Sequence, residues 1–390
     1  MLLVDVTRTS HSRARTGIQR VCRALVAELA ADGAAAAVCF DPYRGAWRQL
    51  NPSEEAVFHA GPGDRGGPRG ARWTLAQKVT GRARRLLGPR PELPQADALL
   101  CPELFSPEVA AQLPALFAAV HGPRVAIFHD ALGLKFPELT PRATVARLPS
   151  YLRELLHFDG VVAVSEDSAA SLRDYWSWLG VADTPPVRAL PNALDPGPVI
   201  PGRTVEPSPP RILCVGTIEG RKNHAALLAA CETLWQAGGK FELQLIGLAR
   251  PDTAGSALGE IHRLQNSGRP LRYDGAVSDE ALAVAYANCT FTVYPSLAEG
   301  FGLPVMESLA RGRPCVCSAH GALGELARGG GCAALASVDA ASLAAAIGRL
   351  LANPAKLASL SAAARARIFP TWREYRAELF EWIRQLPRRH

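Results

Sequence analysis

The chain has 390 residues, of which 48% are hydrophobic and 20% are charged, and this composition excludes a disordered or fibrous protein. At about 100–200 residues per domain, the length predicts two domains. The formal net charge is +7. Residues 61–90 alone carry the same net charge, because they contain eight Lys or Arg residues and one Asp.

Short apolar runs alternate with helical periods along almost the whole chain, a pattern typical of α/β proteins. The first run begins at the N-terminus, so we expect no signal peptide. An amphipathic helix is predicted over 18–29, and another after Ser165, which is a good N-cap. The predicted buried strands of the first half are 2–6, 96–101, 124–130 and 160–165.

The clearest linker is 195–210, which holds six prolines and two glycines in sixteen positions. After it the alternation restarts. The predicted strands of the second half are 211–216, 241–247, 290–296 and 314–319, and the predicted helices are 224–235, 279–288, 341–353 and 371–386.

Two successive α/β units predict two Rossmann-like, doubly wound parallel-sheet domains that face each other across a cleft. We place the N-terminal domain at 1–197, with a basic insertion at 61–95. The C-terminal domain is 198–372, and a C-terminal helix at 373–390 is expected to pack back on the N-terminal domain.

Ligands of such sheets bind beyond the carboxyl ends of the strands, where this sequence places several polar groups. Gly17 closes a basic loop at a helix start, and Arg221 with Lys222 follows the strand 211–216. The two cations suit a diphosphate, although solvated surface cations would look the same. His129 and Asp130 end a strand, where a histidine is catalytic or structural.

The segment AEGFGLPVMESLARG (298–312) follows a predicted strand and holds Glu299 and Glu307 around a glycine turn. Gly300 and Gly302 let the backbone N–H groups of 300–303 approach a polar ligand closely. A carboxylate accepts two hydroxyl groups at once, as vicinal diols of a sugar or ribose require. No D-x-D sequence occurs, so we expect cationic side chains, not a metal ion, to neutralise phosphates.

The basic segment 61–90 mixes cations with Trp73, Leu75, Val79, Leu86 and Leu87. It is either a solvated insertion or a contact for anionic lipid headgroups or an acidic acceptor. Nucleic acid is not expected, because no RNP, helix-turn-helix or zinc-finger signature occurs. No apolar run reaches the ~18–20 residues that cross a bilayer. Nine cysteines without a C-x-x-C pair are read as reduced thiols. We expect a cytoplasmic protein, peripheral to the inner face of the membrane.

The segments VGTIEGRKNH and YPSLAEGFGLPVMESLARGRPCVCS resemble the retaining glycosyltransferases of family 4, which have the GT-B fold. The segments DVTR, TGIQRV, FHDALGLKFPEL, VVAVSEDSAASL and ALPNALD are similar to the branch that builds bacterial surface polysaccharides, often mannosyltransferases. The resemblance covers nearly the whole chain. It implies that the domain at 1–197 binds the acceptor and that the domain at 198–372 binds the nucleotide sugar.

The resemblance implies a role for each matching residue. Glu299 would contact the transferred sugar, Glu307 the ribose hydroxyls, and His129 the donor sugar at the reaction centre. Arg221 and Lys222 would clamp the diphosphate with the Gly17 loop. The remaining donor-binding residues would be Gly216, Thr217, Val277, Gly300, Phe301, Gly302 and Leu303, and acceptor binding is assigned to Arg20, Asp130 and Ser165.

Thr217 departs from the family, because many members carry an arginine there. Without that arginine, Arg221 and Lys222 would supply the positive charge for the diphosphate. The resemblance implies metal-independent transfer with retention, from GDP-mannose as the favoured donor, to a saccharide or lipid-linked saccharide of lipopolysaccharide O-antigen, capsule or exopolysaccharide. Rhamnose, fucose, GlcNAc and glucose donors, a phosphorylase- or epimerase-like reaction and a non-catalytic assembly scaffold remain alternatives.

Overall fold

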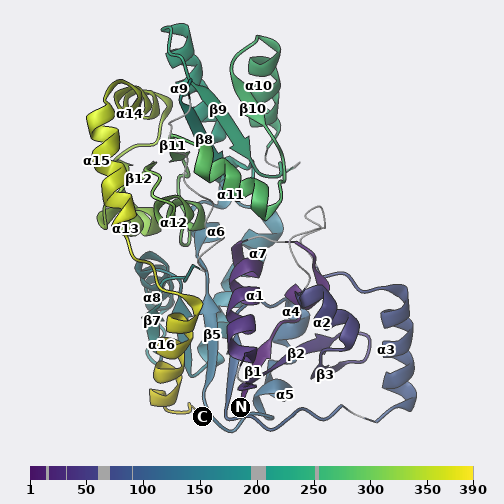
Figure 1. Cartoon of the computed structure of the whole chain (residues 1–390). Coiled ribbons are helices and arrows are strands. Elements are labelled where there is room, and N and C mark those ends of the chain that lie inside the picture. The colour runs from purple at the N-terminus through teal and green to yellow at the C-terminus, as the bar shows by residue number, and fades with distance from the viewer. Residues whose placement is uncertain are drawn as a thin grey trace. The chain divides into compact units, whose positions relative to one another are not determined.

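The structure is a computed structural model that describes residues 1–14, 17–31, 33–59, 71–89, 91–194, 208–250 and 254–389. It divides into two compact units (Figure 1). The N-terminal unit comprises Met1–Asp130, Ala146–Ala193 and Pro370–His390, and the C-terminal unit comprises Ala131–Val145 and Leu194–Phe369. The expected boundary at 197 and the part of the basic insertion at 61–70 lie outside the described residues.

Among the described residues, the N-terminal unit has a seven-stranded sheet in the order β3-β2-β1-β4-β5-β6-β7. All neighbouring strands run parallel except β2 and β3, which form an antiparallel pair. The strands are β1 (Leu2–Asp5), β2 (Ala35–Asp41), β3 (Ala46–Gln49), β4 (Ala98–Cys101), β5 (Arg124–Phe128), β6 (Gly160–Ala163) and β7 (Val187–Ala189).

Several helices of this unit begin at a residue whose side chain caps them. Ser165 caps α8 by accepting a hydrogen bond from the Ser168 N–H at 3.1 Å. The helices are α1 (Gly17–Ala30), α2 (Pro52–His59), α3 (Leu75–Leu87), α4 (Pro107–Ala110), α5 (Leu113–Phe117), α7 (Arg142–Glu154, shared with the other unit), α8 (Glu166–Trp178) and α16 (Trp372–Gln385).

Helix α16 returns the end of the chain to the N-terminal unit. Its Arg376 side chain donates a hydrogen bond to the Glu28 carbonyl oxygen of α1, at 3.3 Å. Trp382 and Leu386 lie so close to β6 that a Cβ at Gly160 would approach their side chains to 2.8 and 2.7 Å. Close packing therefore fixes this helix against the sheet.

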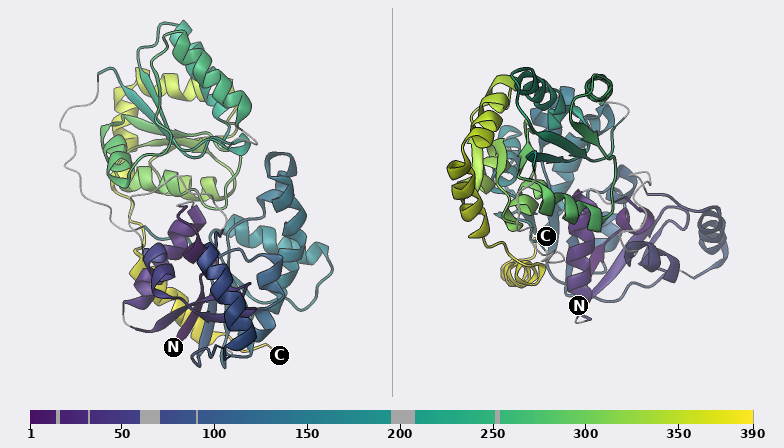
Figure 2. Two further views of the ribbon diagram at one scale, coloured as in Figure 1. Left: turned by 90° about the vertical axis from the view of Figure 1, so that its right-hand side faces the viewer. Right: turned by 45° about the horizontal axis from the view of Figure 1, so that its top comes forward.

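The C-terminal unit has a parallel sheet in the order β10-β9-β8-β11-β12-β13, six strands in the part of the chain that is described. Helices cover both of its faces (Figure 2). One face packs against α9, α10 and α14, and α11 lies on the other. The strands are β8 (Arg211–Val215), β9 (Glu242–Ile246), β10 (Leu271–Tyr273), β11 (Phe291–Tyr294), β12 (Cys315–Ser318) and β13 (Cys332–Leu335).

Residues 131–145, which hold α6 (Leu132–Lys135), group with this C-terminal unit, a division that the sequence does not predict. The Leu139 side chain lies 3.4 Å from where a Cβ on Gly220 would stand. The other helices are α9 (His224–Gln236), α10 (Gly255–Asn266), α11 (Asp279–Asn288), α12 (Leu303–Ala310), α13 (Gly321–Arg328), α14 (Ala340–Ala352) and α15 (Pro354–Arg365). Within the described residues, no helix combines the length and the hydropathy needed to span a bilayer.

Two parallel-sheet α/β units confirm the predicted fold class. The buried strands of both sheets read as continuous apolar runs because helices cover them on both sides.

Candidate active site

The turn that follows β8 carries the two predicted cations. Arg221 and Lys222 lie in a 3-10 turn, Gly220–Lys222, directly before α9. Asn223 joins the turn to the helix in a left-handed conformation, with φ 56°. Its side-chain amide donates hydrogen bonds to the carbonyl oxygens of Val338, at 2.8 Å, and Pro295, at 3.3 Å. These bonds hold the cations beside the loop that follows β11.

Glu299, on that loop, is held by both cations at once. Its Oε1 lies 2.6 Å from the Lys222 ammonium and its Oε2 lies 2.7 Å from the Arg221 guanidinium. The side chain is 9% exposed. Burial alone would raise the pKa of Glu299, but the charges of Arg221 and Lys222 outweigh it and lower the pKa to about 2. Glu299 is therefore a carboxylate at any physiological pH.

Lys222 is the buried member of the cation pair. Its ammonium donates a hydrogen bond to the Tyr294 hydroxyl and lies 4.6 Å from the centre of that ring. Burial lowers the pKa of Lys222, and the Glu299 carboxylate opposes that shift. Tyr294, the last residue of β11, therefore fixes where the charge of Lys222 stands.

Arg221 makes a second ion pair, with Glu219, at 2.9 Å. Its backbone carbonyl accepts a hydrogen bond from the Leu297 N–H at 2.9 Å, which ties the two loops together. Burial would lower the pKa of Arg221, and the Glu299 and Glu219 carboxylates reverse that effect and raise it. The group therefore presents a permanent positive charge.

The glycine turn between the two predicted glutamates needs a conformation that other residues avoid. Gly302 has φ 110° and precedes α12, and a Cβ there would lie 2.6 Å from the Leu323 side chain. Glu307 lies on α12, is 2% exposed, and accepts a hydrogen bond from the Tyr286 hydroxyl at 3.1 Å. Both glutamates thus belong to the segment at the carboxyl end of β11.

The loop that holds Val277, one of the predicted donor-binding residues, follows β10. Its Gly275 carbonyl accepts a hydrogen bond from the Gly247 N–H at 2.7 Å. A Cβ at Gly247 would stand only 1.9 Å from the Gly216 carbonyl oxygen, so the loops after β8 and β9 approach closely there. Val277 is half-buried, and Thr217 is half-buried next to Gly216. The predicted donor residues of this unit therefore gather at one edge of one sheet.

His129 lies directly after β5 in the N-terminal unit and is 6% exposed. Its Nε2 lies 2.8 Å from the Pro102 carbonyl oxygen, and because a carbonyl only accepts, Nε2 carries the hydrogen. The Ser168 hydroxyl donates to the His129 carbonyl oxygen at 3.0 Å. Burial lowers the pKa of His129, so the imidazole is neutral at physiological pH.

The other predicted residues of this unit differ in their surroundings. Gly17 is the first residue of α1 and Arg20 is exposed on the same helix. Asp130 is half-buried, whereas Ser165 is 1% exposed and caps α8. The acceptor-binding role of Arg20, Asp130 and Ser165 stays a prediction.

Two buried carboxylates at the same sheet edge were not identified from the sequence. Asp5 ends β1 and accepts hydrogen bonds from the N–H and hydroxyl of Thr7, at 2.9 and 2.6 Å. Glu103 follows β4 and accepts the N–H groups of Arg8 and Thr9, both at 2.9 Å. Burial raises the pKa of Asp5 to about 6 and that of Glu103 to about 7. Both carboxylates hold the loop after β1.

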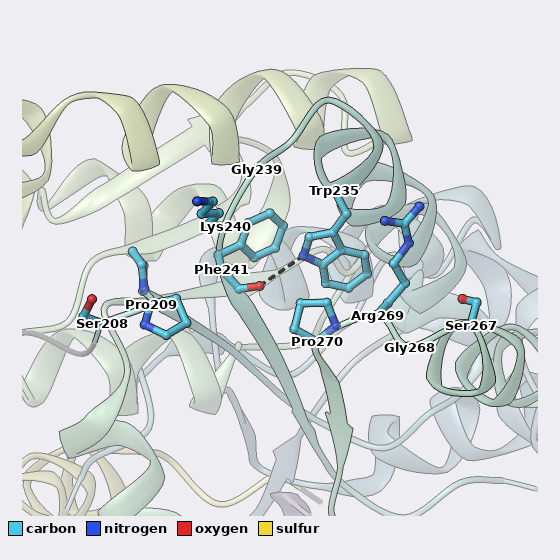
Figure 3. Close-up of a pocket in the computed structure, with 11 residues that line it drawn as sticks. Ser208, Pro209, Trp235, Gly239, Lys240, Phe241, Ser267, Gly268, Arg269 and Pro270 are labelled. Atoms are coloured by element: carbon cyan, nitrogen blue, oxygen red, sulfur yellow. Dashed lines mark hydrogen bonds between the residues drawn. The ribbon is translucent and has the colours of Figure 1, made fainter.

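A groove at the opposite end of the C-terminal sheet is shown in Figure 3. It is lined by residues that precede β8, β9 and β10, among them Trp235, Phe241 and Arg269. The Trp235 indole N–H donates to the Phe241 carbonyl oxygen at 3.1 Å, the dashed line in the figure. Because Arg221 and Glu299 follow the carboxyl ends of strands, this groove is separate from the candidate site.

Comparisons with known proteins agree with this geometry. Residues 209–353 match the family described as glycosyl transferases group 1. The chain aligns with the solved structure of sucrose-phosphate synthase from Thermosynechococcus elongatus, with a TM-score of 0.70, 21% identity and 98% of both chains covered. The chain has the GT-B fold, and residues 209–353 of its C-terminal unit are similar to the group 1 glycosyl transferases. The resemblance inferred from the motifs is confirmed at this level.

Two curated relatives of this GT-B chain are mannosyltransferases of Escherichia coli. Serotype-specific mannosyltransferase WbdA is 26% identical over 337 residues, which are 81% of this chain and 38% of WbdA. O-antigen chain mannosyltransferase B is 37% identical over 107 residues, 27% of this chain and 28% of that protein. The chain therefore spans less than two fifths of the length of the relatives it matches.

Proposed function

We propose that this chain is a retaining glycosyltransferase that moves a sugar, with mannose as the first candidate, from a nucleotide-diphosphate sugar to a saccharide or lipid-linked saccharide. The observation that carries the proposal is Glu299 bridged by Arg221 and Lys222 at the carboxyl edge of the C-terminal sheet. The Glu299 carboxylate can accept hydrogen bonds from sugar hydroxyls, and the two cations beside it can bind phosphates.

Mannose and surface-polysaccharide synthesis are supported by the two mannosyltransferase relatives, one of which acts on O-antigen chains. Under this proposal the acceptor belongs to lipopolysaccharide O-antigen, capsule or exopolysaccharide. The protein would act on the cytoplasmic side of the membrane, where nucleotide sugars are made.

The two cations would stabilise the leaving nucleoside diphosphate as its charge develops. Lys222 is positioned by Tyr294, and Arg221 by Glu219, so neither side chain needs to reorganise during the reaction. The N-terminal end of α12 adds backbone N–H groups that have no partner within the helix. We propose that these groups suffice without a metal ion.

Glu299 is better suited to reading sugar hydroxyls than to acting as an acid or a nucleophile. Both of its oxygens are engaged by cations, and a pKa of about 2 leaves no proton to donate near neutrality. We therefore propose front-face displacement, in which the departing phosphate takes the acceptor proton and the α configuration is retained. Glu307 would hold the ribose hydroxyls.

A donor panel read by thermal shift tests this function. GDP-mannose, GDP-fucose, UDP-glucose, UDP-GlcNAc and dTDP-rhamnose are added in turn to the purified chain. The true donor at about 100 times its Kd stabilises the fold by about 2.7 kcal/mol, by mass action. A shift with another sugar would replace mannose, whereas no shift with any of them would favour a non-catalytic scaffold.

A further inference from the structure

Helix α3 presents its apolar side chains to solvent. Leu75, Val79, Leu86 and Leu87 are 77%, 56%, 82% and 89% exposed. A helix on the surface of a globular protein normally buries such a stripe. Figure 1 shows α3 at the rim of the N-terminal unit, beyond the edge strand β3.

The helix packs on its unit through the opposite face. At about 100° per residue, Leu75, Val79 and Leu86 fall within about 40° of one another around the axis. Gly81, the buried residue of α3, lies on the far side, where a Cβ would approach the Tyr43 side chain to 2.8 Å. The inward face is therefore small and the outward face is apolar.

This orientation is fixed by specific contacts and does not reflect a loosely held segment. Thr74 and Gln77 form a capping box at the start of the helix. The Gln77 amide also donates to the buried Glu54 carboxylate at 3.0 Å. Just before the helix, Trp73 stacks on His11 with the ring centres 3.7 Å apart.

The positive charges of the helix indicate which kind of surface its apolar face binds. Residues 71–89 carry five cations and no acidic residue. Lys78 and Arg82 lie over the Tyr43 ring, at 5.7 and 5.4 Å from its centre, and border the apolar stripe on the side nearer Gly81. Arg84 and Arg85 are exposed in the last turn. An apolar stripe bordered by cations fits a surface that is anionic outside and apolar beneath.

We propose that α3 docks the N-terminal unit on an anionic lipid surface, with Leu86 and Leu87 inserted between headgroups and the arginines against their phosphates. An amphipathic helix lying in the interface has this arrangement of side chains. Nucleic acid offers no apolar layer for the leucines. The proposal goes beyond the glycosyl transfer and does not depend on it.

Vesicle co-sedimentation of the full chain tests the docking. The probes are vesicles of phosphatidylcholine alone and of phosphatidylcholine with phosphatidylglycerol in equal parts. The wild type should sediment with the anionic vesicles, and high salt should weaken the binding. Leu86→Glu/Leu87→Glu should reduce partitioning by at least about 100-fold, and Arg84→Gln/Arg85→Gln by roughly 25-fold, at about fivefold for each arginine.

Ile368→Glu is the matched control, because Ile368 is 93% exposed and lies outside α3. It should sediment as the wild type does. Equal binding of the wild type and the leucine variant would overturn the proposal, as would absence of wild-type binding. The proposal would also be overturned if the wild type were a dimer that does not bind vesicles and the leucine variant were a monomer. That result would show that α3 contacts a second copy of the chain. Thermal shifts of the same variants with the donor test the proposed function separately. A donor-induced shift without vesicle binding would overturn only the docking proposal.

Discussion

Replacing Lys222 with alanine tests the cation pair most sharply, because the change removes one charge and leaves its neighbours in place. In Lys222→Ala, Glu299 keeps its 2.7 Å ion pair with Arg221, so no buried charge is left alone. The free energy of unfolding should therefore fall by about 1–2 kcal/mol, less than the ~3–5 kcal/mol that breaking a buried ion pair completely costs.

Turnover should fall much further than stability. Removing one preorganised group that stabilises developing charge costs about 10²–10³-fold in kcat. The assay is release of nucleoside diphosphate from the donor found in the thermal-shift panel, together with a melting curve of each variant. Lys240→Ala is the control, because Lys240 is exposed beside the groove at the other end of the sheet. A Lys222→Ala variant that turns over within about threefold of the wild type would refute the electrostatic reasoning.

Three further changes give separate outcomes. Tyr294→Phe keeps the ring and removes the hydroxyl that holds Lys222, so kcat should fall about tenfold with little change in folding, measured by the same assay. Gly302→Ala should lower stability by about 2 kcal/mol, because φ 110° is strained for alanine and Leu323 must move; an unchanged denaturation midpoint would contradict this. The pKa of Asp5 is raised to about 6, so its contribution to stability is present below about pH 4 and is lost as pH rises through 6. Asp5→Asn should therefore gain in melting temperature relative to the wild type between pH 4 and pH 8.

The fold could be predicted from the sequence where helices cover a strand on both faces. Strands 2–6, 124–130 and 211–216 appear as β1, β5 and β8 with nearly the same bounds, because a fully buried strand is a continuous apolar run. The antiparallel strand β3 was missed, because an edge strand of four residues, two of them apolar and two charged or polar, has little periodic signal.

The candidate site was predicted in its residue types but not in its contacts. The glycine turn beside Glu299 and the two adjacent charges of Arg221 and Lys222 were enough to predict these residues, because both features are visible in a short stretch of sequence. The supporting groups Tyr294 and Glu219 were not identified, because an aromatic at a strand end and a glutamate in a loop have many structural uses. The outward stripe of α3 also depends on tertiary packing, since periodicity gives the stripe but not the side that it faces.

Release of nucleoside diphosphate by the wild type and by Glu299→Gln, with the donor and a saccharide acceptor, tests the central claim most directly. Glutamine keeps the shape of Glu299 but loses the charge that both cations hold. We expect acceptor-dependent release by the wild type, a fall of at least about 100-fold in the variant, and a product with the α configuration of the donor. Acceptor-dependent release that is equal in the two proteins would contradict the proposed role of Glu299.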